Sequence, residues 1–93
     1  MITFKDLTVD DDKKSCYDKN KEVILTKTEY NLLLFLITNK NKIFNRKELA
    51  NKIWNTSVSD RAVDTTISRL RKKLKCIEKY LKTRVGFGYG LLE

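Results

Sequence analysis

The sequence contains no histidine, only two cysteines and no long apolar run. Without histidine the commonest general base of enzymes is missing, and the carboxylates fall in turns and at helix starts instead of forming a convergent pair. Cys16 and Cys76 have neither a histidine nor a C-x-x-C spacing beside them, so they offer no metal site and only a weak case for a disulfide. We therefore expect reduced cysteines, no enzymatic activity, no metal and no cofactor.

No segment approaches the roughly 20 apolar residues that cross a bilayer. The first residues, 1–14, also lack the apolar region of a secretion signal. A chain of 93 residues is long enough for one small domain with a single modest core. The sequence thus predicts one domain over 1–93, located in the cytoplasm.

Charge is abundant, and its placement is uneven. The formal net charge is +8: residues 1–40 hold seven Lys/Arg against seven Asp/Glu, whereas residues 41–93 hold thirteen against five. Lysine and arginine gain affinity for a polyanion by displacing counterions from its phosphates. Nucleic acid is therefore the leading candidate partner. A membrane surface is not expected, because the helix that carries the charge has a narrow apolar stripe suited to a protein core.

Segment 60–75 carries the strongest functional signal. At 100° per residue its apolar side chains form one narrow stripe, made of Val63, Ile67, Leu70 and Leu74. Opposite, within an arc of about 100°, lies a face of cationic and hydroxyl side chains: Arg61, Thr65, Ser68, Arg69 and Lys72. Such a face suits base edges in a major groove, with Arg71, Lys73 and Lys75 toward the phosphates on either side. The alternative interpretation is a solvated charged surface.

The rest of the chain alternates strand and helix signals. Residues 1–25 read as an antiparallel meander, whose buried face can be supplied by Ile2, Phe4, Val23 and Leu25. The capping-box spacings Thr26 to Glu29 and Asn45 to Glu48 predict helices near 28–40 and 46–54. The first of these is apolar on all sides at its centre, 32–37, which indicates burial.

A polar link, 55–59, precedes the cationic helix, and Ser59 or Asp60 can cap that helix. The order helix, loop, cationic helix is typical of a helix-turn-helix, although this link is longer than the tightest examples. Near the C-terminus, Gly86, Gly88 and Gly90 stand between two β-like runs. We expect them at a hairpin tip that needs positive φ.

Three segments in this order resemble the DNA-binding effector domain of OmpR/PhoB-type response regulators: LTKTEYNLLLFLITNKNKIFNRKELANKIW, DRAVDTTISRLRKKL and KTRVGFGYGL. The resemblance covers almost the whole chain. It implies an α+β winged helix-turn-helix, with an N-terminal four-stranded antiparallel sheet (1–25), a three-helix core (26–75) and a C-terminal β-hairpin wing (76–93). It also implies a sequence-specific effector of a two-component system, with helix 60–75 in the major groove and wing 80–92 at the neighbouring minor groove.

The resemblance implies individual DNA contacts. Arg69, in the I-x-R-L-R motif, corresponds to a base-contacting position, and its guanidinium fork matches the two acceptors of guanine. Thr65 and Ser68 occupy positions that vary with the target and are also expected at bases. Thr66 stands where many members carry histidine, so only a shorter hydroxyl is available there. Phosphate contacts are expected from Arg46, Trp54, Arg61, Thr66, Arg71, Lys72, Arg84 and Tyr89. For Trp54 the alternative is core packing, and Arg46 can simply begin a helix.

The wing departs from the family pattern T-V-R-G-x-G-Y-R. Here the segment Thr83–Gly90 reads TRVGFGYG, so the arginine and the β-branched residue have exchanged places and the later arginine is missing. Neighbouring residues of a strand face opposite sides. The arginine that the family places in the minor groove is therefore repositioned or absent, which leaves Lys82, Arg84 and Tyr89 as candidate backbone contacts.

Members of the family bind direct repeats as head-to-tail dimers, and their loop before the third helix can touch RNA polymerase. The corresponding loop here comprises Asn55, Thr56, Ser57, Val58 and Ser59. A typical member also carries a receiver domain, which this chain does not contain, so we expect a fragment or a stand-alone effector. The second hypothesis is a winged-helix interaction module whose basic face binds an acidic protein or a structured RNA.

Overall fold

A four-stranded antiparallel sheet forms the N-terminal part of the computed structural model, which describes residues 1–93. Its strands follow chain order: β1 (Ile2–Phe4), β2 (Leu7–Asp10), β3 (Ser15–Asp18) and β4 (Lys21–Val23). The run ITFKDLTV divides into two strands because Lys5 adopts a positive φ of 55°, which allows Phe4 to pair with Leu7.

The buried face of this sheet differs in part from expectation. Phe4 is buried as predicted, but Ile2, Val23 and Leu25 are only half-buried. The tight turn after Phe4 changes which residues of the next strand face the core. The buried positions that follow are Leu7, Val9 and Cys16.

Helix α1 (Lys27–Thr38) begins at the predicted capping box. The Thr26 hydroxyl accepts a hydrogen bond from the Glu29 N–H, and the Glu29 carboxylate accepts one from the Thr26 N–H. The helix ends before residue 40 because Asn39 leaves the helical region of φ and ψ. Its apolar centre is largely enclosed, as predicted, with four buried side chains: Leu32, Leu33, Leu36 and Ile37.

The second helix has two parts. A capping box between Asn45 and Glu48 starts α2 (Arg46–Leu49), and the chain continues as a π-helical turn, η1 (Ala50–Trp54). Asn55 then takes the left-handed conformation, with φ 58°, and donates its N–H to the Ala50 carbonyl. This left-handed cap ends the helix, and the link 55–59 begins at Asn55.

Helix α3 (Asp60–Lys73) is capped by Ser59, whose hydroxyl oxygen accepts a hydrogen bond from the Ala62 N–H. It ends two residues earlier than predicted, and a short 3-10 turn, η2 (Lys75–Ile77), follows. The predicted stripe is fully buried: the exposed fraction is 0% for Val63, Ile67, Leu70 and Leu74. The opposite face of α3 is therefore the one that remains available.

The C-terminal hairpin pairs β5 (Leu81–Arg84) with β6 (Gly88–Leu91), and Phe44 bridges to Tyr89 on the other side of β6. Gly86 and Gly88 adopt positive φ at the turn, as expected. Gly90 does not: it lies inside β6, where an added Cβ would stand 2.1 Å from the Lys42 carbonyl oxygen. Close backbone approach, not turn geometry, requires this third glycine.

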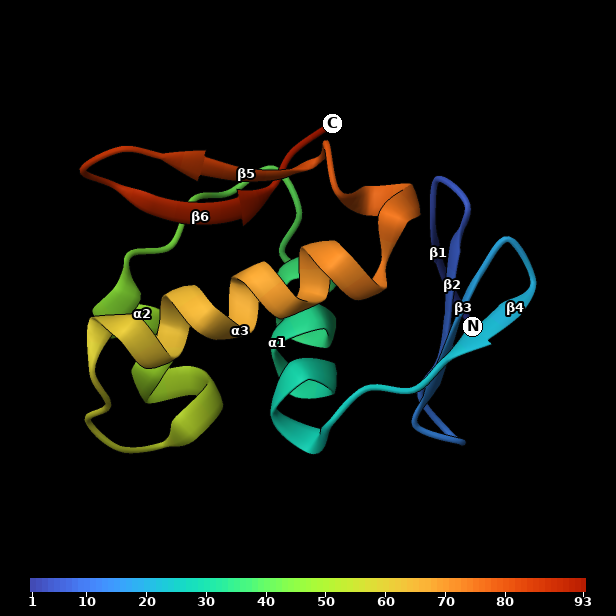
Figure 1. Cartoon of the computed structure of the whole chain (residues 1–93), viewed down its shortest axis with the longest axis horizontal. Coiled ribbons are helices and arrows are strands. Elements are labelled where there is room, and N and C mark those ends of the chain that lie inside the picture. The colour runs from blue at the N-terminus through green and yellow to red at the C-terminus, as the bar shows by residue number, and fades with distance from the viewer.

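Figure 1 shows α3 crossing in front of α1, with the β5–β6 hairpin above it and the N-terminal sheet at one end. Helix α2 and the link 55–59 lie at the opposite end, beside the start of α3. One hydrophobic cluster joins the sheet, the helices and the hairpin. The predicted α+β winged-helix architecture is thus confirmed. None of its helices has the length and apolar character needed to cross a membrane.

Candidate nucleic-acid interface

The face of α3 opposite the buried stripe is open to solvent. Arg61, Ser68, Arg69 and Lys72 are exposed, and Thr65 is half-buried among them. None of the three cations has a carboxylate within 4.0 Å. Their charge is therefore not neutralised within the chain, and it is available to a polyanion.

Trp54 borders this face on the side of the link. It shares a shallow depression with the cationic face, lined by Trp54, Ser59, Arg61, Ala62, Thr65, Thr66 and Arg69. The indole is half-buried and packs against the hydrophobic core. Core packing and a position beside Arg69 are both present, so the two interpretations of Trp54 are compatible.

Thr66 lies largely buried at the edge of this depression. It is 8% exposed, and its hydroxyl donates to the Ala62 carbonyl at 2.9 Å within α3. A hydroxyl that is already bonded inside the helix supports the helix, and a contact with a phosphate would require it to give up that bond.

Arg71 joins α3 to the wing. Its Nε and one terminal nitrogen donate to the Leu81 carbonyl at 2.9 and 2.6 Å, and the same terminal nitrogen donates to the Thr83 hydroxyl at 2.8 Å. The guanidinium also lies 5.8 Å from the centre of the Tyr89 ring. Arg71 thereby fixes the position of β5 relative to the helix.

Asp64 links α2, α3 and the wing, and sequence reasoning did not single it out. Its carboxylate accepts two hydrogen bonds from Arg46, at 2.9 and 3.0 Å, and another from the hydroxyl of Tyr89. These donors, Arg46 first, hold the pKa of Asp64 below its usual value. Arg46 also lies 3.7 Å from Asp60. The available sequence signal was an acidic residue inside an otherwise cationic helix.

Tyr89 therefore lies in the interior instead of on the wing surface. It is 7% exposed, and its hydroxyl donates a hydrogen bond to the Asp64 carboxylate. Burial, followed by the contact with Asp64, raises the pKa of Tyr89. Through its side chain, β6 is connected to α3: one tyrosine joins the wing to the same carboxylate that holds Arg46.

The far end of α3 is held by an ion pair between exposed Lys73 and buried Glu29. Lys73 donates to the Glu29 carboxylate at 2.7 Å, and Glu29 is 2% exposed. Burial alone would raise the pKa of Glu29, but the hydrogen bonds from Lys73 and Thr26 outweigh it and leave the pKa below the usual value. Both ends of α3 are thus fixed by carboxylates, which orients the exposed face between them.

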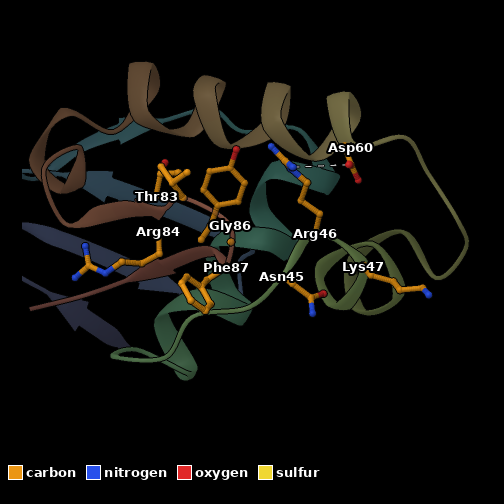
Figure 2. Close-up of a pocket in the computed structure, with 11 residues that line it drawn as sticks. Asn45, Arg46, Lys47, Asp60, Thr83, Arg84, Gly86 and Phe87 are labelled. Atoms are coloured by element: carbon orange, nitrogen blue, oxygen red, sulfur yellow. Dashed lines mark ion pairs between the residues drawn. The ribbon is translucent and has the colours of Figure 1, made fainter.

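A cleft separates the wing from the start of α2. Figure 2 shows Arg46 and Asp60 facing each other on one side, with Thr83, Arg84, Gly86 and Phe87 along the other. Arg84 is exposed and has no carboxylate within 4.0 Å. The wing therefore adds a free positive charge beside the N-terminal half of α3.

The two cysteines play no part in this surface. Cys16 is buried and Cys76 is half-buried, and both are free thiols. Burial raises the pKa of Cys16 to about 11 and that of Cys76 to about 12. At neutral pH both remain protonated, and protonated thiols are poor nucleophiles.

Changing Tyr89 to phenylalanine tests the connection between wing and helix. We expect Tyr89→Phe to lower the free energy of unfolding by about 1–2 kcal/mol at pH 7, because a buried charge-assisted hydrogen bond is lost. The pKa of Asp64 is lower in the folded chain than in the unfolded chain, where it is about 4. Ionised Asp64 therefore stabilises the fold above about pH 4, and this stabilisation is lost as the pH falls and the carboxylate is protonated. The difference between variant and wild type should therefore shrink toward pH 3 in urea denaturation.

Tyr80→Phe is the matched control for this experiment, because no hydrogen bond is present at the Tyr80 hydroxyl. It should leave the unfolding curve unchanged at every pH. An equal loss in both variants, or a Tyr89→Phe loss that is constant from pH 7 to pH 3, would contradict the assigned link to Asp64.

Comparison with known proteins agrees with this architecture. A family model described as "Transcriptional regulatory protein, C terminal" matches residues 20–91. The transcriptional regulatory protein SrrA of Staphylococcus aureus is 37% identical over 95 residues, covering 96% of this chain and 39% of SrrA. The chain thus spans about two fifths of the length of the curated relatives that it matches.

Solved structures share the whole fold. The DNA-binding domain of the response regulator AdeR, solved in complex with an intercistronic region, is 36% identical, has a TM-score of 0.86 and aligns over 100% of both chains. DrrB, an OmpR/PhoB homologue from Thermotoga maritima, is 36% identical with a TM-score of 0.88, covering 98% of this chain and 43% of DrrB.

The class that fold and surface define is a winged-helix DNA-binding domain of transcription factors, and it is not a class of enzymes. Within that class, the chain belongs to the family of C-terminal effector domains of OmpR/PhoB-type response regulators.

Proposed function

We propose that this chain binds double-stranded DNA sequence-specifically and serves in the cytoplasm as the effector of a two-component transcriptional regulator. The observation that carries the proposal is the exposed, unpaired Arg69 on the free face of α3, in the depression that it shares with Trp54. With its stripe buried in the core, α3 offers this face alone to the major groove, while the wing lies at the neighbouring minor groove.

The contacts divide between reading bases and touching phosphates. Arg69 reads a base, and Thr65 and Ser68 border it on the same face. Phosphate contacts come from exposed side chains around this face: Arg61, Lys72 and Arg84, with Arg46 through its 45% exposed side chain and Trp54 through its indole N–H. Arg71, Tyr89 and Thr66 instead hold the helix and the wing in place.

We assign the loop Asn55–Ser59 to RNA polymerase contact. Four of its residues are exposed and only Val58 is half-buried, so it presents mainly polar groups beside the start of α3 (Figure 1). Head-to-tail pairing of two copies on a direct repeat completes the proposal. The interaction-module hypothesis is not favoured, because AdeR, which shares the whole fold, was solved with DNA.

The salt dependence of binding tests the proposal. Arg61, Lys72 and Arg84, the three assigned phosphate contacts without an ion pair, should give a slope of log K against log [salt] of about −3, since each contributes about −0.9. Fluorescence anisotropy with a random-sequence 30-base-pair duplex, measured from 50 to 200 mM salt, should show this steep loss of affinity. Lys72→Ala should reduce the slope by about 1.

Lys13→Ala is the matched control. Lys13 is an exposed lysine in the turn between β2 and β3, in the N-terminal sheet and not on α3 or the wing. It should leave the slope unchanged. A shallow slope for wild type, an equal change in both variants, or tighter binding to an acidic polypeptide or a structured RNA at the same salt would refute DNA as the partner.

A further inference from the structure

The tip of the wing exposes two large apolar side chains next to each other. Val85 is 90% exposed and Phe87 is 73% exposed, and only Gly86 separates them. Water-exposed phenylalanine and valine at a hairpin tip gain nothing for the stability of the fold. Their position, at the end of the element that lies beside α3, points to a contact with whatever α3 binds.

The tip is held in a defined shape. The Phe87 N–H donates to the Arg84 carbonyl at 2.8 Å, and Gly86 and Gly88 supply the positive φ values of the turn. Below the tip, Tyr89 exchanges two backbone hydrogen bonds with Phe44, at 2.8 and 2.9 Å. The apolar pair is therefore presented on a preorganised hairpin, which lowers the entropy cost of binding.

Charge near the tip favours a polyanion as the occupant. Lys47 and Arg84 line the same cleft as Val85 and Phe87, and both are exposed with no carboxylate within 4.0 Å. Of the neighbouring acids, Asp60 lies beside Arg46, and Glu48, which caps α2 through the Asn45 N–H, faces Arg84 and Phe87 across a second depression. An apolar tip flanked by two unpaired cations fits a groove between phosphate strands. Two side chains offer far less than the roughly 800 Å² per partner of a stable protein interface.

We propose that Val85 and Phe87 form an apolar wedge that enters the minor groove next to the site read by α3. This inference rests on the proposed function. Apolar side chains inserted from the minor groove partly unstack a base step and kink the duplex. The cost is smallest at pyrimidine–purine steps such as TA and CA, so the wing selects sequence through DNA deformability instead of through an arginine.

The test uses a duplex selected from a random library by the wild-type chain, with 2-aminopurine placed in turn at each position flanking the bound site. Unstacking raises the fluorescence of this base analogue. We expect a rise of at least about twofold at one step when wild type binds, and its loss with Phe87→Ala, accompanied by about tenfold weaker binding. Phe87→Leu, which keeps an apolar wedge, should restore much of both signals.

Ile24→Ala is the matched control, because Ile24 is 75% exposed but lies between β4 and α1. It should change neither signal. All variants sit at exposed positions, so circular dichroism should give the wild-type unfolding midpoint for each. A fluorescence rise that persists in Phe87→Ala, or no rise at any flanking position, would overturn the wedge.

The outcomes separate this inference from the proposed function. If no duplex is enriched by the wild-type chain, sequence-specific DNA binding itself fails. If a duplex is enriched and its binding depends on Arg69, while Phe87→Ala binds it with wild-type affinity and fluorescence, only the wedge fails.

Discussion

Replacing Gly88 with alanine should lower the free energy of unfolding by about 3 kcal/mol, a large share of the 5–15 kcal/mol that stabilises a small domain. Gly88 has a φ of 130°, which side chains rarely adopt and which costs about 1–3 kcal/mol. An added Cβ would also stand 1.9 Å from the Phe44 carbonyl oxygen. The hairpin would have to move, which breaks the two Phe44–Tyr89 hydrogen bonds at about 0.5–1.5 kcal/mol each.

Gly86→Ala separates the cost of the positive φ from the cost of the contact with Phe44. Gly86 also has a positive φ, of 84°, but nothing lies within 4 Å of an added Cβ. We expect a loss of only about 1 kcal/mol there. Urea denaturation of both variants measures the difference, and equal losses would show that the contact with Phe44 does not restrain the hairpin.

Arg69→Ala should remove discrimination between the preferred DNA site and a site changed at one base pair. A bidentate arginine–guanine contact is worth about 1–3 kcal/mol of discrimination. Because Arg69 is exposed and makes no ion pair, its removal should leave the unfolding midpoint unchanged. Anisotropy titrations against both duplexes at one salt concentration give the two affinities, and their ratio should fall toward one.

Lys72→Ala provides the comparison for Arg69→Ala, since Lys72 lies on the same face and is assigned to a phosphate. It should weaken binding to both duplexes by the same factor and keep the ratio. If Lys72→Ala lowers the ratio and Arg69→Ala does not, the assignment of base reading to Arg69 is wrong.

Local patterns predicted the parts of the fold that depend on neighbours in sequence. The 3.6-residue spacing of Val63, Ile67, Leu70 and Leu74 predicted which side of α3 is buried, and both capping boxes formed as expected. These signals succeed because each is complete within a few residues of the chain.

The parts that sequence reasoning missed depend on distant partners. Asp64 meets Arg46 and Tyr89, which lie 18 and 25 residues away, and no spacing rule indicates such a meeting. Tyr89 and Thr66 were expected at phosphates because the family resemblance places them there, whereas in the structure both are buried and their hydroxyls are bonded within the chain. Gly90 was grouped with the turn glycines, since close approach of Lys42 is visible only in three dimensions.

The most direct measurement of the central claim is a double-mutant cycle between Arg69 and the N7 atom of the guanine that it reads. Each guanine of the selected site is replaced in turn by 7-deazaguanine, which lacks that acceptor, and binding of wild type and Arg69→Ala is measured. At one position wild type should lose about 5–30-fold in affinity while Arg69→Ala loses nothing further. Equal losses for both proteins at every guanine would contradict an Arg69 side chain in the major groove.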